Sequence, residues 1–180
     1  MVDRVDRQSL TRRVRVMCPV VNVRRVAGML PVAVLGCAIA GMPAAGADNK
    51  RLNDGVVANV YTVQHQHGCA GDVTISPQLQ LAAEWHANDV LDNRALDGDI
   101  GSDGSTPQAR ADAAGFTGVV AETVAITPAL AINGVEIMNQ WYYRPDYLAI
   151  MSDCTNTRMG VWSVNSLDRS VVVAVYGQPA

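Results

Sequence analysis

Serine, histidine and acidic side chains are the groups in this sequence that could carry out nucleophilic catalysis. Ser102 and Ser105 lie in a Gly-Ser-Asp-Gly-Ser run, with His86 before them and Glu122 after them. A serine hydrolase needs a serine nucleophile and a histidine base that an acid orients. The sequence has no Gly-x-Ser-x-Gly between a strand and a helix, which such a mechanism often uses. Hydrogen bonding within a turn explains both serines more simply, so we expect a non-catalytic protein and keep a hydrolase as the weaker hypothesis.

The three histidines are the other candidates for chemistry. His65 and His67 are two residues apart near the end of a predicted helix, so they point in different directions, whereas a metal-binding pair on a helix would be four residues apart. We interpret them as polar residues of the last turn, where the helix dipole favours them. His86 lies within an apolar helix face, where it is either a hydrogen-bonded core residue or the rim of a cleft.

The run from Asp99 to Arg110 is expected to be a tight loop that enters a short helix. Its glycines tolerate left-handed backbone angles, and its Ser and Asp side chains bond their own backbone. Thr106 can cap the helix and Pro107 suits its first position. Gly115 is placed to end that helix.

Other helices are predicted from apolar spacing and capping residues. Leu52, Val56, Val60 and Val63 recur at helical spacing, which indicates a helix that ends near Gly68. Ser76-Pro77 and Thr127-Pro128 each have the hydroxyl and proline that open a helix. The second helix has one apolar face, which comprises Leu79, Ala82, Ala83, His86, Ala87 and Val90. Trp85 is expected to pack at the edge of the sheet, and the fourth helix is expected to run from Thr127-Pro128 through Leu130, Met138 and Trp141.

Three strands are expected in the second half of the chain. Residues 120–125, 159–165 and 170–176 are apolar and β-branched, and the turn residues 166–169 between the last two indicate a hairpin. Helices before and between these strands should cover the sheet in layers. The sequence therefore predicts an α+β domain with a small antiparallel sheet.

The order of these motifs resembles the secreted CAP family (SCP-like, pathogenesis-related-1-like) in its bacterial form. The resemblance rests on the Gly-Ser-Asp-Gly-Ser loop, the arginine helix, Ala114-Gly115, the Val120–Ala125 strand, and Trp141 followed by Arg144-Pro145-Asp146-Tyr147. It extends from Leu52 to the C-terminus. It implies the CAP-like α-β-α sandwich, with four helices around the sheet, as one domain over residues 48–180.

The resemblance also implies a cleft in which CAP domains commonly place two histidines and two glutamates, a set that binds zinc in some members. The corresponding positions here are Asp99, Glu122, Tyr147 and Arg144. Only Glu122 keeps the family's residue type, and two carboxylates without imidazole make a weak zinc site. We therefore expect a degenerate cleft with no metal ion and no cofactor, with His86 as its possible rim. A weakly held hard cation at Asp99 and Glu122 remains open, as does neutralisation by Arg144 or by Arg110, which in the family braces loops.

Residues 1–47 have the composition of a signal peptide. An arginine-rich segment precedes the apolar run Val26–Met42, and Ala45-Gly46-Ala47 fits a cleavage motif. A retained membrane anchor, a translation start at Met17 and a lipidated Cys37 are the alternatives. Residues 48–180 carry seven Lys and Arg against fifteen Asp and Glu, a formal net charge of −8. This charge disfavours nucleic acid and anionic membranes as partners, so we expect a secreted or extracellular protein, with the cell envelope possible, and no stable membrane insertion after cleavage.

Cys69 and Cys154 are the two cysteines of the predicted mature chain. In an oxidising compartment they would most simply form one disulfide. Two unpaired buried thiols are the alternative.

Two functions from different classes follow, and the sequence favours the first slightly. The first is a carrier of a small lipid or other apolar ligand, with a cleft lined by Met138, Leu148, Ile150 and Met151. The second is an interaction module with an extracellular or cell-wall partner and no small ligand. Exposed apolar area over residues 146–151 would favour the carrier, and a polar cleft closed by Tyr147 would favour the interaction module.

Overall fold

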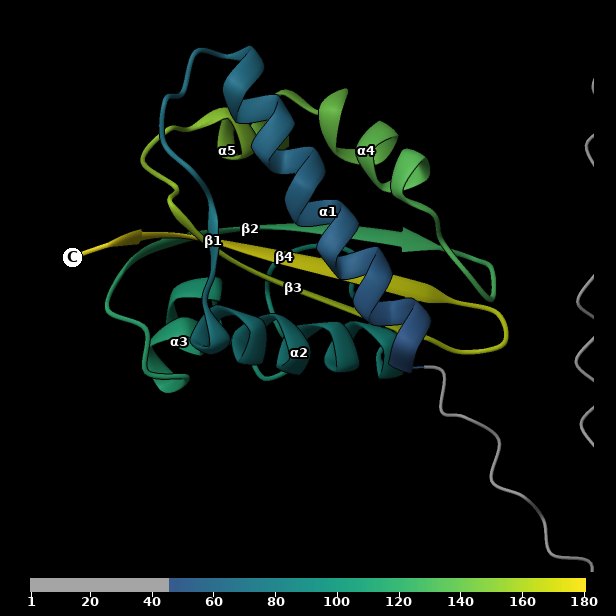
Figure 1. The fold of residues 1–180 in the computed structure, drawn as a ribbon. Helices are drawn as coiled ribbons and strands as arrows, with labels where there is room; N and C mark the ends of the chain where they lie inside the picture. Colours follow the sequence, from purple (N-terminus) through teal and green to yellow (C-terminus); the bar gives the residue numbers. More distant parts are fainter. Residues whose placement is uncertain (1–45) are drawn as a thin grey trace, which may run out of the picture. The chain divides into compact units, whose positions relative to one another are not determined.

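A sheet between two layers of helices forms the domain (Figure 1). The computed structural model describes residues 46–180. Its elements are α1 (Gly46–Gln66), β1 (Thr74–Ile75), α2 (Pro77–Asp92), α3 (Pro107–Ala113), β2 (Gly118–Thr127), α4 (Gly134–Tyr142), α5 (Pro145–Ser152), β3 (Arg158–Asn165) and β4 (Ser170–Pro179). The predicted α+β class and layered architecture are confirmed.

The sheet has the strand order β1-β3-β4-β2. β4 pairs antiparallel with both β2 and β3, and the predicted β3–β4 hairpin closes with a 2.7 Å bond from the Ser166 amide to the Arg169 carbonyl. β1 pairs in parallel with β3. The sheet is therefore mixed, whereas we expected a purely antiparallel sheet. With two residues, β1 is too short for any alternation of side chains to reveal it.

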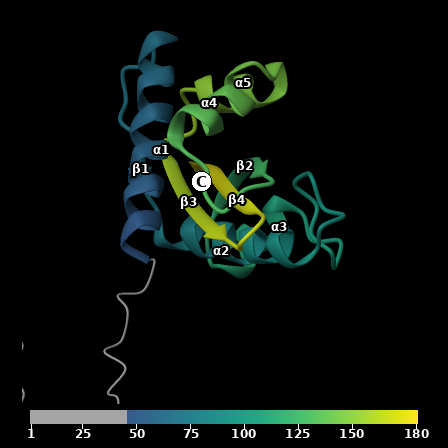
Figure 2. The ribbon, with the colours of Figure 1, turned by 90° about the vertical axis from the view of Figure 1, so that its right-hand side faces the viewer.

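Two apolar cores lie on the two faces of the sheet. On one face, Val171, Val173 and Val175 of β4 pack with the apolar face of α2. On the other, Val172 and Tyr176 pack with residues of α1, α4 and α5. Figure 2 shows the strands between the α2–α3 layer and the α4–α5 layer. Because β4 is buried on both faces, its sequence is a continuous apolar run.

The first three predicted helices are present. α1 ends close to the expected Gly68, and α2 and α3 begin at the expected prolines. The Ser76 hydroxyl accepts the Leu79 amide at the start of α2, and the Thr106 hydroxyl accepts the Ala109 amide at the start of α3. Gly115 follows α3 with φ +84°. These local signals need no tertiary context.

The predicted start of the fourth helix is wrong. Thr127 ends β2, and its hydroxyl donates to the Glu136 carboxylate and caps no helix. α4 begins after Asn133, whose side chain accepts the Glu136 amide at 3.0 Å. Pro145 then opens α5. The described residues therefore form five helices, one more than the four that we expected.

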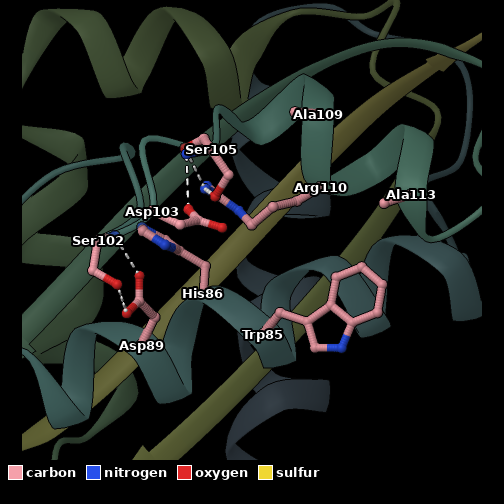
Figure 3. Close-up of a pocket in the computed structure, with 9 residues that line it drawn as sticks. All are labelled: Trp85, His86, Asp89, Ser102, Asp103, Ser105, Ala109, Arg110 and Ala113. Atoms are coloured by element: carbon pink, nitrogen blue, oxygen red, sulfur yellow. Dashed lines mark hydrogen bonds between the residues drawn. The ribbon is translucent and has the colours of Figure 1, made fainter.

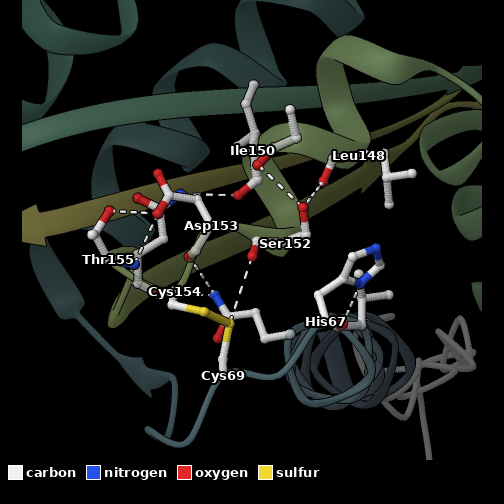
Figure 4. Close-up of a disulfide and its surroundings, with 12 residues drawn as sticks. His67, Cys69, Leu148, Ile150, Ser152, Asp153, Cys154 and Thr155 are labelled. Atoms are coloured by element: carbon white, nitrogen blue, oxygen red, sulfur yellow. Dashed lines mark hydrogen bonds between the residues drawn. A yellow bond between two sulfur atoms is a disulfide. The ribbon is translucent and has the colours of Figure 1, made fainter.

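A disulfide joins Cys69, just after α1, to Cys154, just after α5 (Figure 4). The two cysteines are 85 residues apart in the sequence, with a Cα–Cα distance of 5.2 Å. The predicted pairing is confirmed, and the alternative of two free thiols is wrong.

Gly160 allows α2 to lie directly on β3. A Cβ atom there would be 2.1 Å from both the Gln80 nitrogen and the Leu79 carbonyl carbon. We expect Gly160→Ala to lower the free energy of unfolding by about 1–3 kcal/mol, because the helix must move off the sheet. Urea denaturation measures the loss, with Gly71→Ala as the control because open space surrounds Gly71. Equal midpoints for the two variants would contradict this account.

The predicted signal peptide, residues 1–47, lies outside the described residues except for its last two positions. Its boundary with the domain at residues 47 and 48 stays a prediction. No helix within residues 46–180 has both the length and the apolar character that a bilayer span requires.

Candidate functional site

The side chains of Arg110 and Glu122 pair in a buried position between α3 and β2. The Nη2 atom of Arg110 lies 3.0 Å from Oε1 and 3.1 Å from Oε2 of Glu122. The same nitrogen donates to the Asp99 carbonyl at 2.7 Å, and Nη1 donates to the Ser105 carbonyl at 2.8 Å. Both side chains are buried. Arg110 therefore holds the Glu122 carboxyl group and braces the loop. When Glu122 is ionised, Arg110 supplies the counter-ion that a buried charge requires.

The loop between Asp99 and Arg110 is bonded to itself, as predicted. The Gly101 amide donates to the Ser105 carbonyl, and the Ser105 amide donates to the Asp103 carboxylate at 2.8 Å. Gly104 has φ +79°, a conformation that favours glycine. Asp89 of α2 accepts from both the amide and the hydroxyl of Ser102, each at 2.7 Å. These contacts attach the loop to α2.

His86 lies at the junction of α2, the loop and β2. Its side chain is buried, and its Nε2 atom is 2.9 Å from the Gly98 carbonyl and 3.4 Å from Oε1 of Glu122. A carbonyl only accepts, so Nε2 carries the proton and Nδ1 is left with a free lone pair. Nδ1 has no hydrogen-bond partner. His86 is thus a core residue, and its Nδ1 atom is buried without a hydrogen-bond partner.

Burial acts on both titratable groups of this cluster. It raises the pKa of Glu122 to about 8, and Arg110 only partly offsets this effect. It lowers the pKa of His86 below its ordinary value, although the bond to Gly98 acts in the opposite direction. In both cases the neutral form is favoured because low-dielectric surroundings disfavour an isolated charge.

The free energy of unfolding is expected to fall as pH rises from 6.5 to about 8. Folded Glu122 keeps its proton up to about pH 8, whereas unfolded Glu122 loses it near 4.5, so the folded state binds more protons in this range. The opposite contribution of His86 ends near 6.5. The slope is at most about 1.4 kcal/mol per pH unit. Urea denaturation at several pH values should show this slope in the wild type and a flatter one in Glu122→Gln; equal slopes would count against the assignment.

A pocket of about 450 Å³ lies beside this cluster, between α2, α3 and the loop (Figure 3). Its lining residues are Trp85, His86, Asp89, Ser102, Asp103, Ser105, Ala109, Arg110 and Ala113. Trp85 is 41% exposed and forms part of this wall, so our expectation that it packs at the sheet edge is wrong. Trp85 and Asp89 are four residues apart, which places them on one helix face, and this spacing could have revealed the pocket.

Comparison with known proteins identifies the fold but not a function. No family model matches the sequence, and no curated protein matches it. The solved structures include an outer surface protein of Borrelia burgdorferi, with a TM-score of 0.60 and 16% identity over 69% of this chain and 90% of that one. An extracellular SCP-domain protein of Bacillus anthracis has a TM-score of 0.58 and 16% identity. The described chain has a CAP-like fold. A cysteine-rich secretory protein of Staphylococcus aureus has a TM-score of 0.55 and 10% identity.

Coverage differs among these structures. The match spans 77% of this chain and 45% of the Bacillus protein, and 72% of this chain and 39% of the Staphylococcus protein. The chain thus spans less than half of the length of these two proteins.

The four residues to which the resemblance assigned a degenerate metal cleft do not form a ligand set within residues 46–180. Both oxygens of Glu122 are bound by Arg110. Arg144 lies 3.7 Å from the ring centroid of Tyr147 and pairs with Asp146 at 2.7 Å. Asp99 is exposed, and its backbone carbonyl accepts from Arg110. These residues do not fit zinc, since imidazole is missing and the glutamate is already paired. Within residues 46–180 no three His, Cys, Asp or Glu side chains are placed to hold a metal ion.

Arg110 and Arg144 were the two arginines expected as possible partners of Glu122, and Arg110 is the one that pairs with it.

Tyr147 is buried, and burial raises its pKa. The assignment of these four positions to a ligand cleft stays a prediction.

The apolar residues expected to line a lipid cleft lie in the core or pack against it. Met151 is fully buried, and Met138, Leu148 and Ile150 are partly buried against the same cluster. A different pocket, of about 640 Å³, lies between α1 and the segment before α4. Leu52, Leu130 and Ile132 contribute its apolar lining.

His65 and His67 occupy the last turn of α1 and the residue after it, and both are exposed. Nδ1 of His67 is 2.8 Å from the Val63 carbonyl, and the His65 ring packs on Tyr61. They are placed as polar residues of a helix end, as predicted.

Proposed function

We propose that this chain is the binding module of an exported protein, that it performs no catalysis, and that it recognises an extracellular or cell-envelope partner through the Asp99–Arg110 loop. The observation that carries the proposal is the Arg110–Glu122 pair. At the position where the CAP fold commonly has a metal ligand, the carboxylate is buried and is used to hold the loop. Glu122, which could have been a metal ligand, instead binds the arginine that holds the loop.

Export is supported by several independent features. A disulfide between Cys69 and Cys154 is typical of oxidising compartments. Residues 48–180 have a formal net charge of −8, which suits a protein that stays in solution. The structures with the same fold are described as an outer surface protein, an extracellular protein and a secretory protein.

The hydrogen bonds of the loop serines also favour a structural role over a hydrolase. The Ser102 hydroxyl donates to Asp89 at 2.7 Å, and the Ser105 hydroxyl accepts from Arg110 at 3.1 Å. His86, the candidate base, uses Nε2 for the Gly98 carbonyl. A serine nucleophile would instead be bonded to its base.

A lipid carrier is the second candidate, and the pocket at Leu52, Leu130 and Ile132 favours it. Leu130 is exposed there and would be covered by an apolar ligand. The segment Asp146–Met151, however, keeps its larger apolar side chains at least partly buried, and Tyr147 is buried among them. By this criterion the interaction module is the better supported of the two.

A native mass spectrum of the oxidised protein from its secretion medium separates the two candidates. An unmodified protein mass, with and without added zinc, is the result expected for the interaction module. A mass excess that organic extraction removes would establish the carrier instead. Stoichiometric zinc uptake would show that the account of the Glu122 position is wrong.

Retention by isolated cell envelopes of the producing organism tests the partner directly. We expect the protein to sediment with the envelopes and Ile100→Lys to abolish this, because Ile100 is an exposed apolar residue of the loop. Val135→Lys is the matched control, an exposed apolar residue on α4 in the other helix layer. Equal retention of both variants, or none for the wild type, would contradict the proposal.

A further inference from the structure

β2 lies at one edge of the sheet, so among the described residues no strand pairs with its outer side. An edge strand presents unpaired N–H and C=O groups, with which a strand of another chain can pair. Lysine, proline or a bulge in the strand often prevents this. β2 contains no lysine or proline, and it pairs with β4 over all ten residues without a bulge. Its protection must therefore come from other parts of the chain.

Two glutamine side chains bond the outer side of β2. Gln108, on α3, donates through Nε2 to the Gly118 carbonyl at 3.0 Å and accepts the Val120 amide at 3.1 Å. Gln140, on α4, accepts the Ile126 amide at 3.2 Å and donates to the Ile126 carbonyl at 3.1 Å. Each side chain thus gives β2 one donor and one acceptor, as a residue of a neighbouring strand would.

These bonds lie at the two ends of β2, and packing covers its centre. Residues 122–125 are buried. Glu122 binds Arg110 from α3, and α5 also packs on the strand. Val119, by contrast, is 62% exposed. The ends of β2 are therefore the parts that a partner chain could reach, and they are the parts that the glutamines bond.

The opposite edge of the sheet offers less room for a partner. β1 pairs with Arg158 and Met159 of β3, and farther along β3 the Asn49 side chain of α1 donates to the Ser163 carbonyl at 3.2 Å. Two copies of the chain would therefore join through β2, edge to edge about a two-fold axis. Such a contact uses the same surface of both copies, so association would stop at a dimer.

We propose that Gln108 and Gln140 close the β2 edge and prevent a second copy of this chain from adding its own β2 to the sheet. Each glutamine occupies hydrogen-bonding positions that the incoming strand would need. Without the two side chains, the backbone groups that they bond become free, and β2 of two copies can pair antiparallel. This protection is independent of the proposed function, which involves the Asp99–Arg110 loop.

Sedimentation equilibrium and amide hydrogen exchange test the proposal on the oxidised protein. We expect a monomer for the wild type and about a twofold greater mass for Gln108→Ala/Gln140→Ala. In dilute solution, where the double variant is a monomer, the Val120 and Ile126 amides should exchange about 2–10-fold faster than in the wild type, as expected for the loss of one hydrogen bond. At concentrations that give the dimer, these amides should be protected again.

Gln64→Ala is the matched control. Gln64 donates to the Asp153 and Asn156 carbonyls, each at 3.1 Å, so its removal also breaks two bonds to the backbone but leaves the β2 edge closed. We expect this variant to stay a monomer. Val119→Lys, added to the double variant, should restore the monomer, because lysine on an exposed edge strand opposes pairing.

Several results would overturn the proposal. One is a double variant that stays a monomer at every soluble concentration, whatever its exchange rates. Another is equal association of Gln64→Ala, since general destabilisation would then explain the dimer. A dimer that Val119→Lys leaves intact, or a wild type that already pairs through β2, would also overturn it. If the double variant does not fold, Gln108→Ala and Gln140→Ala are tested singly, and each should form a weaker dimer.

Discussion

Arg110→Met is expected to lower the free energy of unfolding by about 3–5 kcal/mol at pH 9, where Glu122 is ionised. The substitution leaves the Glu122 carboxylate buried without its counter-ion. It also removes the donors to the carbonyls of Asp99 and Ser105. At pH 6 the loss should be smaller, because burial keeps the pKa of Glu122 near 8 and the carboxyl can hold a proton. Urea denaturation at both pH values measures the difference.

Arg94→Met is the matched control for this effect. Arg94 also pairs with a carboxylate, that of Asp168 at 2.7 Å, but both side chains are largely exposed. Exposed pairs contribute about 0–1 kcal/mol. The double variant Arg110→Met/Glu122→Leu is a second comparison. It removes both charges and should recover part of the stability that Arg110→Met loses. A small, pH-independent loss for Arg110→Met alone would refute the role given to this pair.

Removal of the disulfide is expected to have an effect of similar size. The double variant Cys69→Ala/Cys154→Ala should lose about 2–5 kcal/mol, towards the upper end because the closed loop is long. The cysteines are separated by 85 residues, so the cross-link restricts the unfolded chain strongly. Guanidinium denaturation under oxidising conditions measures the loss.

A reducing agent provides the control for the disulfide. It should shift the denaturation midpoint of the wild type towards that of the double variant and leave the variant unchanged. An equal shift in both proteins would show that the reductant acts elsewhere. An unchanged wild type would mean that the 69–154 link contributes little to stability.

Part of the candidate site could be predicted from the sequence. The self-bonded loop and the start of α3 follow from Gly104 and Thr106, whose effects reach only a few residues. The role of Arg110 as a brace came from the resemblance to CAP proteins, and the structure confirms it. The choice of Arg110 over Arg144 as the partner of Glu122 could not be made in advance, because it depends on how α3 packs against β2.

The residues expected to line a lipid cleft show a limit of sequence reasoning. Met138 and Met151 have the apolar character that a cleft or a core would need, and periodicity does not distinguish the two. In the structure Met151 belongs to the core between the sheet and α1, α4 and α5, and Met138 packs against this core while partly buried. The α2–α3 pocket was missed for the converse reason, since its residues come from two helices and a loop.

Local sequence signals were sufficient for the capped starts of α2 and α3, the β3–β4 hairpin and the layered α+β class. The cysteine pairing also followed from the sequence, because only two cysteines lie beyond the predicted leader. Tertiary structure decided the addition of β1, the start of α4 and the pairing of Glu122. It also decided which polar atoms of His86 and Arg110 were left without partners. These features depend on contacts between distant segments, and contact energies of that kind outweigh the small local propensities on which sequence patterns rest.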